Sequence, residues 1–425
     1  MNTDNASLYV KWLKQEVAPA LGCTEPVAIS FAAAYAAQYL DQPCTKISGF
    51  ISANLYKNAT GVTIPGTTVC GVPLAAAIGA FGGDPQKGLK TLEDITPRHV
   101  EMAQKLIANN AVDIAVEETP DFIHLDLTLS AGENCCRVVV KGTHTNVVEL
   151  YINGQPQPLS EKQNTRTQRE TLPTFSLQQA YDFINRVDFN DIRFILDAAR
   201  LNSALAAEGK TKKYGLNING TFSDAVKNGL MSNDLLSKVI INTVAASDAR
   251  MGGAPVVAMS NFGSGNQGIT ATMPVVVVAE HLGVDEETLA RALSLSHLTA
   301  ISIHSRYTRL SALCAASTAA MGAAAGMAWL FTRDINTINT AIINMVSDIT
   351  GMICDGASNS CAMKVSSVVS SAFKAVLMAM QNSCAGANDG IVCADVEQTI
   401  NNLCRLVIKP MTLTDKEIIS IMVAK

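Results

Sequence analysis

The chain has 425 residues, a formal net charge of -5 and 48% hydrophobic but only 16% charged residues. This length predicts more than one domain, and the hydrophobic content excludes global disorder. The sequence has no long basic run, which argues against a nucleic-acid-binding protein. No signal peptide is recognisable, so we expect a cytoplasmic protein whose eleven cysteines serve metal binding, catalysis or packing rather than disulfides.

Residues 7–40 show the apolar spacing of helices, interrupted by the segment GCTEP at residues 22–26. We expect residues 1–42 to form N-terminal helices that pack on a catalytic domain. Pro26 suits the first turn of a new helix, which would place Cys23 close to a helix N-terminus. Such a position lowers the pKa of a thiol and favours the thiolate.

The region of residues 43–160 has a different character. Alternating or strand-like patterns predict strands at residues 46–53, 122–129, 136–140 and 147–152, the last two as a hairpin around Gly142. Helical segments are expected near residues 72–81 and 97–109. We therefore predict an inserted α/β domain that contains a small antiparallel sheet.

Residues 154–172 are polar and contain two prolines, which predicts a connection between domains. Residues 165–425 are predicted to form a mainly helical catalytic domain, so the fold class is α+β. The uncharged stretch at residues 310–331 is rich in Ala, Gly, Ser and Thr rather than Leu or Ile. This composition favours a tightly packed buried helix over a membrane span. Apolar surface on such helices suggests a homodimer.

Cys354 and Cys361 enclose a loop of Asp, Gly, Ala, Ser and Asn, and Cys314 lies upstream among small residues. Thiolates are the ligands that iron–sulfur clusters require. The spacing alone matches neither Cys-x-x-Cys nor a ferredoxin motif, so buried packing thiols are the competing interpretation. A zinc site on the same cysteines is a weaker alternative, because structural zinc sites prefer a compact set of four ligands.

A glycine-rich segment, GSGNQG at residues 263–268, lies between two apolar runs. Its backbone N–H groups and neutral side chains suit a carboxylate, and the candidate substrate-binding residues are Ser264, Gly265, Asn266 and Gln267. An ordinary tight turn explains the pattern equally well. The glycine spacing of a dinucleotide site is present, but the surrounding strand–helix–strand unit is absent.

Five segments together resemble a known family: GCTEP at 22–26, VTIPGT at 62–67, GSGNQGI at 263–269, RLSALC at 309–314 and MICDGASNSCAMKV at 352–365. They look like the L-cysteine desulfidases and their uncharacterised relatives, which are similar to the alpha chain of the iron–sulfur L-serine dehydratases. The resemblance implies a [4Fe–4S] cluster on Cys314, Cys354 and Cys361, with Cys23 as catalytic thiol or base. The implied reaction converts L-cysteine and water to pyruvate, sulfide and ammonia.

Three further residues have open roles. Glu25 would assist Cys23 or simply cap the helix, while Arg309 and Lys364 would bind a substrate carboxylate or form ordinary ion pairs. Some dehydratase relatives place a C-terminal cysteine on the open iron, and the last six residues of this sequence contain none. We therefore expect a fourth cluster position open to solvent or substrate. The family also tends to have Lys-Pro-Gly or a similar segment where this chain has Ser-Asn-Ser at residues 358–360.

Two other functions stay open at this point. The first is an L-serine dehydratase, since the sequence does not separate sulfur from oxygen as the leaving group. The second is a non-catalytic amino-acid-binding or cluster-sensing protein on the same scaffold. In each case the expected partner is a small amino acid, and neither nucleic acid nor a membrane is expected.

Overall fold

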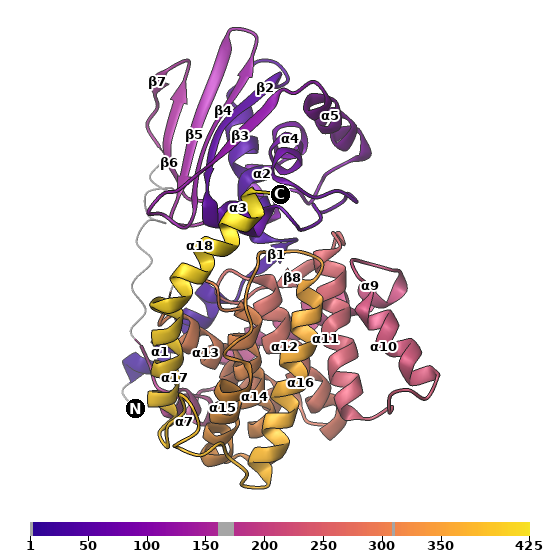
Figure 1. Cartoon of the computed structure of the whole chain (residues 1–425), viewed down its shortest axis with the longest axis vertical. Helices are drawn as coiled ribbons and strands as arrows, with labels where there is room; N and C mark the ends of the chain where they lie inside the picture. Colours follow the sequence, from indigo (N-terminus) through magenta and orange to yellow (C-terminus); the bar gives the residue numbers. More distant parts are fainter. Residues whose placement is uncertain (1–2, 160–173, 308–310) are drawn as a thin grey trace.

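The computed structural model describes residues 3–159, 174–307 and 311–425. The chain forms a body built on a sheet and a larger helical body, stacked along the long axis of the molecule (Figure 1). This arrangement confirms the predicted α+β class. The predicted linker falls partly outside the described residues, and its first part forms a short strand instead of a free connection.

The sheet body contains six strands in the order β3-β2-β4-β5-β6-β7. Their bounds are β2 (Lys46–Ser52), β3 (Val112–Glu117), β4 (His124–Ala131), β5 (Asn134–Lys141), β6 (Val147–Ile152) and β7 (Gln155–Pro156). The strands predicted from alternation are present, and β5 and β6 form the expected antiparallel hairpin. The pattern missed β3, which pairs with β2 in parallel, so the sheet is mixed and not wholly antiparallel.

Four helices belong to the sheet body: α2 (Thr24–Ala37), α3 (Ala53–Ala59), α4 (Val72–Gly82) and α5 (Pro97–Ala108). The sequence placed both N-terminal helices against the helical domain. Only α1 (Thr3–Glu16) packs there, while α2 lies in the hydrophobic core beneath the sheet. The reason is its composition: α2 is Ala-rich and buried on all sides, so no apolar stripe indicates its neighbour. The proposed domain boundaries themselves stay a prediction.

The helical body is made of α1 and the later helices. These are α7 (Leu177–Arg186), α8 (Phe189–Ile192), α9 (Leu196–Thr211), α10 (Ile218–Lys227), α11 (Leu235–Met251), α12 (Gly265–Leu282), α13 (Glu286–His304), α14 (Ala315–Thr332), α15 (Ile335–Ile349), α16 (Cys361–Met380), α17 (Val396–Ile408) and α18 (Pro410–Val423). Several begin where an aspartate side chain accepts a backbone N–H of the first turn, as at Asp234, Asp285, Asp334 and Asp395. Such caps satisfy N–H groups that the helix itself leaves unpaired.

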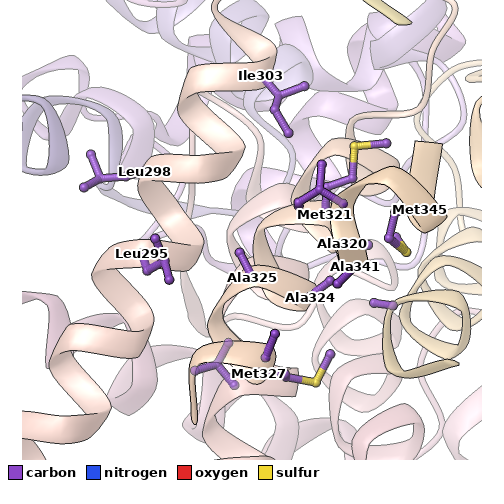
Figure 2. Packing of buried hydrophobic residues seen from close by; sticks show 14 of the residues in the cluster. Leu295, Leu298, Ile303, Ala320, Met321, Ala324, Ala325, Met327, Ala341 and Met345 are labelled. Carbon is purple, nitrogen blue, oxygen red and sulfur yellow. The ribbon is translucent and has the colours of Figure 1, made fainter. Parts of the chain in front are cut away.

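Most of the uncharged stretch, from Ala315 onward, lies in the central helix α14, which is buried along almost its whole length. Its alanines lie between α13 and α15, as Figure 2 shows for Ala320, Ala324 and Ala325. A Cβ added at Gly322 would lie 2.3 Å from the carbonyl oxygen of Ser296 on α13, so the two helix backbones approach closely. Among the described residues, one helix, α16, is long and apolar enough to cross a membrane, and half of it is buried.

The two bodies are joined by elements that pair across the junction. The short strand β1 (Pro19–Leu21) pairs antiparallel with β8 (Val257–Met259), which precedes α12. The C-terminal helix α18 extends from the helical body to the sheet body, where the chain ends close to α3 (Figure 1). The site described next lies at this junction.

Candidate active site

A cavity of about 830 Å³, including its mouth, lies between the two bodies. The sheet body contributes the start of α2, the end of α3 and the turn between β5 and β6. The helical body contributes the end of α11, the loop before α12, the start of α14 and the loop before α16. Cys23, Cys314, Cys354 and Cys361 all line it, so four thiols from distant parts of the chain face one space.

Local backbone pairing brings the segments of Cys314 and Cys354 together, and Cys361 follows seven residues after Cys354. Cys314 is the N-cap of α14, and Cys361 is the first residue of α16. The N–H of Cys314 donates to the carbonyl of Met352 (2.9 Å), and the N–H of Cys354 donates to the carbonyl of Ala312 (2.7 Å). These two bonds hold the segments before α14 and α16 side by side.

The three thiols also influence one another electrostatically. Burial, followed by the neighbouring Cys354 and Cys361, raises the pKa of Cys314 to about 12. Burial and then Cys354 also raise the pKa of Cys361. The N–H of Ser358 points at the Cys361 Sγ from 3.5 Å and acts in the opposite direction. Three neighbouring thiolates repel each other, so a positively charged group among them would stabilise the ionised set.

The three thiols are soft donors, the ligand type that both single soft metal ions and iron–sulfur clusters use. Within the described ranges, no group of three or more His, Cys, Asp or Glu side chains is arranged to hold one metal ion. In a cubane cluster each thiolate binds a different iron atom, so the ligand sulfurs stand further apart than those around a single metal ion.

Cys23 and Glu25 lie near the N-terminus, far from the other three cysteines in the sequence, but they line the same cavity. Cys23 is the N-cap of α2, and its Sγ–H donates to Glu25 Oε2 at 3.0 Å. The Thr24 hydroxyl lies 3.0 Å from the same oxygen. Glu25 Oε1 is 3.6 Å from Nε2 of His144, an ion-pair distance longer than a hydrogen bond. His144 lies in the turn that follows β5, so thiol, carboxylate and imidazole form a chain across the cavity wall.

The pKa of Cys23 differs from the sequence-based expectation. The pKa of Cys23 is raised well above its ordinary value by burial and by the Glu25 carboxylate, which outweigh the lowering by Arg250. The prediction of a lowered thiol pKa was therefore wrong. Burial would raise the pKa of Glu25, but the neighbouring His144 and the Cys23 hydrogen bond together lower it to about 2. At neutral pH the pair is a thiol and a carboxylate.

The glycine-rich segment contributes only part of what the sequence assigned to it. Ser264 caps α12 by accepting the N–H of Gln267, and both Ser264 and Asn266 line the cavity. Gln267 does not, because its amide is held in the core by Asn261 (2.8 Å) and His304 (2.7 Å). Gly265 is also absent from the cavity wall, but it lies directly against the Arg250 side chain.

The remaining predicted substrate-binding residues are placed differently. Lys364 forms an ion pair with Asp355 and does not line the cavity, although its charge lowers the pKa of Cys314 and Cys361. Its ammonium group is therefore engaged on the rim of the cysteine loop. Arg309 lies outside the described residues.

Two ionisable residues of the cavity were missed by sequence analysis. His144 comes from a hairpin turn with no motif around it. Arg250 is 3% exposed and lies in the last turn of α11, among the small residues AASDARMGG. An arginine among such small residues at a helix end is a signal that could have been used, since arginine is rarely fully buried unless it is paired.

The fold and the cavity define an α+β protein with an enzyme-like site of thiols, a carboxylate and an imidazole. The sequence profile described as "serine dehydratase alpha chain" matches residues 86–420, and the chain therefore belongs to that family of dehydratase-type lyases. The match includes the three clustered cysteines but begins after Cys23 and Glu25.

Similar full-length chains carry the designation UPF0597. One from Klebsiella pneumoniae subsp. pneumoniae is 99% identical over 425 residues, which is 100% of both chains. UPF0597 protein YhaM of Escherichia coli strain K12 is 50% identical over 422 residues, covering 98% of this chain and 97% of the other. The same protein of Escherichia coli O127:H6 gives the same values. The similarity extends through the whole chain and so includes the residues before the family match.

Proposed function

We propose that the protein is an iron–sulfur lyase that converts L-cysteine and water to pyruvate, sulfide and ammonia. The observation that carries the proposal is the convergence of Cys314, Cys354 and Cys361 on the cavity that also contains the Cys23–Glu25 pair. Thiols alone would suit several metals, and a thiol–carboxylate pair alone would suit many hydrolases. Their combination suits a reaction that needs both a Lewis acid and a base.

The three clustered cysteines would hold a [4Fe–4S] cluster. When bound through three thiolates, such a cluster supplies an iron with an open position, a Lewis acid for the departing substituent. The donor types fit, because all three ligands are thiols and none is a hard oxygen donor.

The residues on the other wall would move the proton. Cys23, whose Sγ–H donates to Glu25, would take the weakly acidic α-proton of the substrate once it is deprotonated. A thiolate of high pKa is a strong base, although it is rarely populated until its charge is offset. Loss of the β-substituent then gives an aminoacrylate, which becomes an imine and hydrolyses to pyruvate and ammonia.

L-Serine is the second candidate substrate, and the family match to the serine dehydratase alpha chain favours it. The two substrates differ only in sulfur or oxygen at the leaving position. The same residues would serve both reactions, with water leaving in place of sulfide. We also propose that the protein is cytoplasmic and forms a homodimer. Light scattering of the purified protein tests the homodimer.

The test is anaerobic reconstitution with iron and sulfide, followed by assays of pyruvate, ammonia and sulfide from both amino acids. We expect a visible absorption band and turnover, both lost in Cys354→Ala. Cys404→Ala is the matched control, because Cys404 is buried, contacts the carbonyl of Ile303 and does not line this cavity. Faster turnover of serine would assign the dehydratase reaction. A cluster-loaded protein that consumes neither amino acid would refute the lyase, and metal analysis showing zinc would refute the cluster.

A further inference from the structure

We infer that Arg250 is a substrate-binding residue that holds the α-carboxylate of the amino acid in the cavity. The inference rests on the proposed function, because it takes an amino acid as the occupant. It adds a residue that neither the sequence motifs nor the family match assigned. Arg250 is buried, has no ion-pair partner among the described residues and lies between Gly22 and Gly265 of two separate motifs.

Arg250 is 3% exposed and lines the cavity. Its charge is unbalanced locally, because no carboxylate in the described parts of the chain forms an ion pair with it. Other arginines in the helical body, such as Arg306 with Glu397, have such a partner. A buried charge without a counter-ion is costly, and the cost is offset when an anion enters the site.

The side chain of this cavity-lining residue is held by two contacts of its guanidinium group. Its Nε donates to the carbonyl of Gly22 at 3.1 Å, and its Nη1 lies 3.2 Å from the Met251 sulfur. A guanidinium has five N–H groups, so Nη2 and one N–H of Nη1 have no partner in the described residues. Two neighbouring nitrogens with free N–H groups suit the two oxygens of a carboxylate.

Gly265 leaves room for this side chain because it has no Cβ. A Cβ at Gly265 would lie 2.1 Å from Arg250 Nε, so any other residue there would displace the guanidinium. On the other side, Gly22 has φ +70°, and a Cβ on it would lie 2.3 Å from Cγ of Pro65. Gly22 of GCTEP and Gly265 of GSGNQG therefore both lie against Arg250, while Pro65 of VTIPGT packs on Gly22.

The position also suits the chemistry. The charge of Arg250 lowers the pKa of both Cys23 and Cys361, so the guanidinium lies within electrostatic range of the proposed base and of a cluster ligand. A carboxylate held there would place the α-carbon between the two walls of the cavity. A purely structural role, fixing the carbonyl of Gly22, would need none of the free N–H groups.

The experiment measures binding and does not depend on turnover. Isothermal titration calorimetry on the anaerobically reconstituted protein would compare L-alanine, which has no leaving group, with L-alaninamide, which lacks the carboxylate. The wild type should bind L-alanine roughly 10- to 150-fold more tightly, the range for hydrogen bonds to a charged group. Arg250→Gln should lose this preference, and Arg250→Lys should keep part of it. Arg200→Gln, at an exposed arginine on α9, should behave as the wild type.

Gly265→Ala provides a second route, since it displaces the guanidinium without changing the arginine, and it should also lose the preference. Thermal unfolding curves identify any variant that does not fold. The inference is overturned if Arg250→Gln or Gly265→Ala folds and still prefers the acid over the amide as the wild type does. It is also overturned if the wild type shows no preference. If the protein prefers L-alanine over L-alaninamide through Arg250 but consumes neither cysteine nor serine, the proposed lyase activity is refuted and the role of Arg250 stands.

Discussion

A buried ion pair fastens the C-terminal helix to the sheet body. Lys57, on α3, is fully buried and pairs with Asp415 on α18, whose side chain is 9% exposed. Asp415 is the only buried residue of α18, so the helix depends on this contact more than on apolar packing. The Lys57 ammonium also lies 3.4 Å from the carbonyl of Cys354 and 3.5 Å from that of Ser311, which connects the helix to the cysteine loop.

Replacing Asp415 with Asn leaves the Lys57 charge buried with only carbonyl oxygens as partners. Removing one member of a buried pair typically costs about 3–5 kcal/mol, because the remaining charge keeps its desolvation penalty. If α18 opens locally, this cost increases its opening equilibrium roughly 150- to 5,000-fold, at 1.36 kcal/mol per factor of ten. The double variant Lys57→Met with Asp415→Leu removes both charges and should recover most of the loss.

Hydrogen–deuterium exchange with mass spectrometry measures this opening directly in peptides of α18. We expect exchange in Asp415→Asn to increase in α18 and, to a smaller degree, in the loop that contains Cys354. Peptides of α14, deep in the helical body, serve as the internal reference. Unchanged protection of α18 in Asp415→Asn would refute the reasoning, as would a double variant that opens as readily as the single one.

Three further predictions follow from other contacts. His144→Gln should raise the pKa of Glu25 from about 2. In the wild type, the stability that the ionised Glu25 contributes is complete above pH 4.5 and is lost as the pH falls toward 2. Acid-unfolding curves should show that the variant loses this stability at a higher pH than the wild type. Gly322→Ala should destabilise the protein by about 1–3 kcal/mol in denaturant titrations through the α13–α14 contact, whereas Gly351→Ala, with nothing within 4 Å of the added Cβ, should not. Ser264→Ala removes the cap of α12 and should cost about 0.5–2 kcal/mol, whereas Ser264→Asp, which can still cap, should cost less; equal losses would contradict the capping role.

Sequence patterns predicted the elements whose signal is local. Strand β4 alternates between buried and partly exposed residues along its whole length, and its alternation was visible in the sequence. Strand β3 alternates as well, but it is short, lies at the sheet edge and has no fully buried residue, so its signal was weak. The placement of α2 was missed for the opposite reason, since a helix buried on every side carries no directional pattern.

The site could be predicted only where a motif marked it. The three clustered cysteines came from resemblance to a family, because their spacing alone is indistinct. Arg250 was missed because its partners, Gly22 and Gly265, lie in other segments and their contacts exist only in the folded chain. The pKa of Cys23 was misjudged because the helix N-terminus is visible in sequence, whereas burial beside Glu25 is not.

The cavity has a consequence for how the protein must mature. Its lining begins at Cys23 and is complete only with Cys361 on α16. During synthesis the sheet body leaves the ribosome before all of the helical body except α1, when the pocket is still incomplete. Any prosthetic group held by the three late thiols must therefore be inserted after most of the chain has been translated. An assembly factor that delivers it would meet a nearly finished protein, not a nascent amino-terminal half.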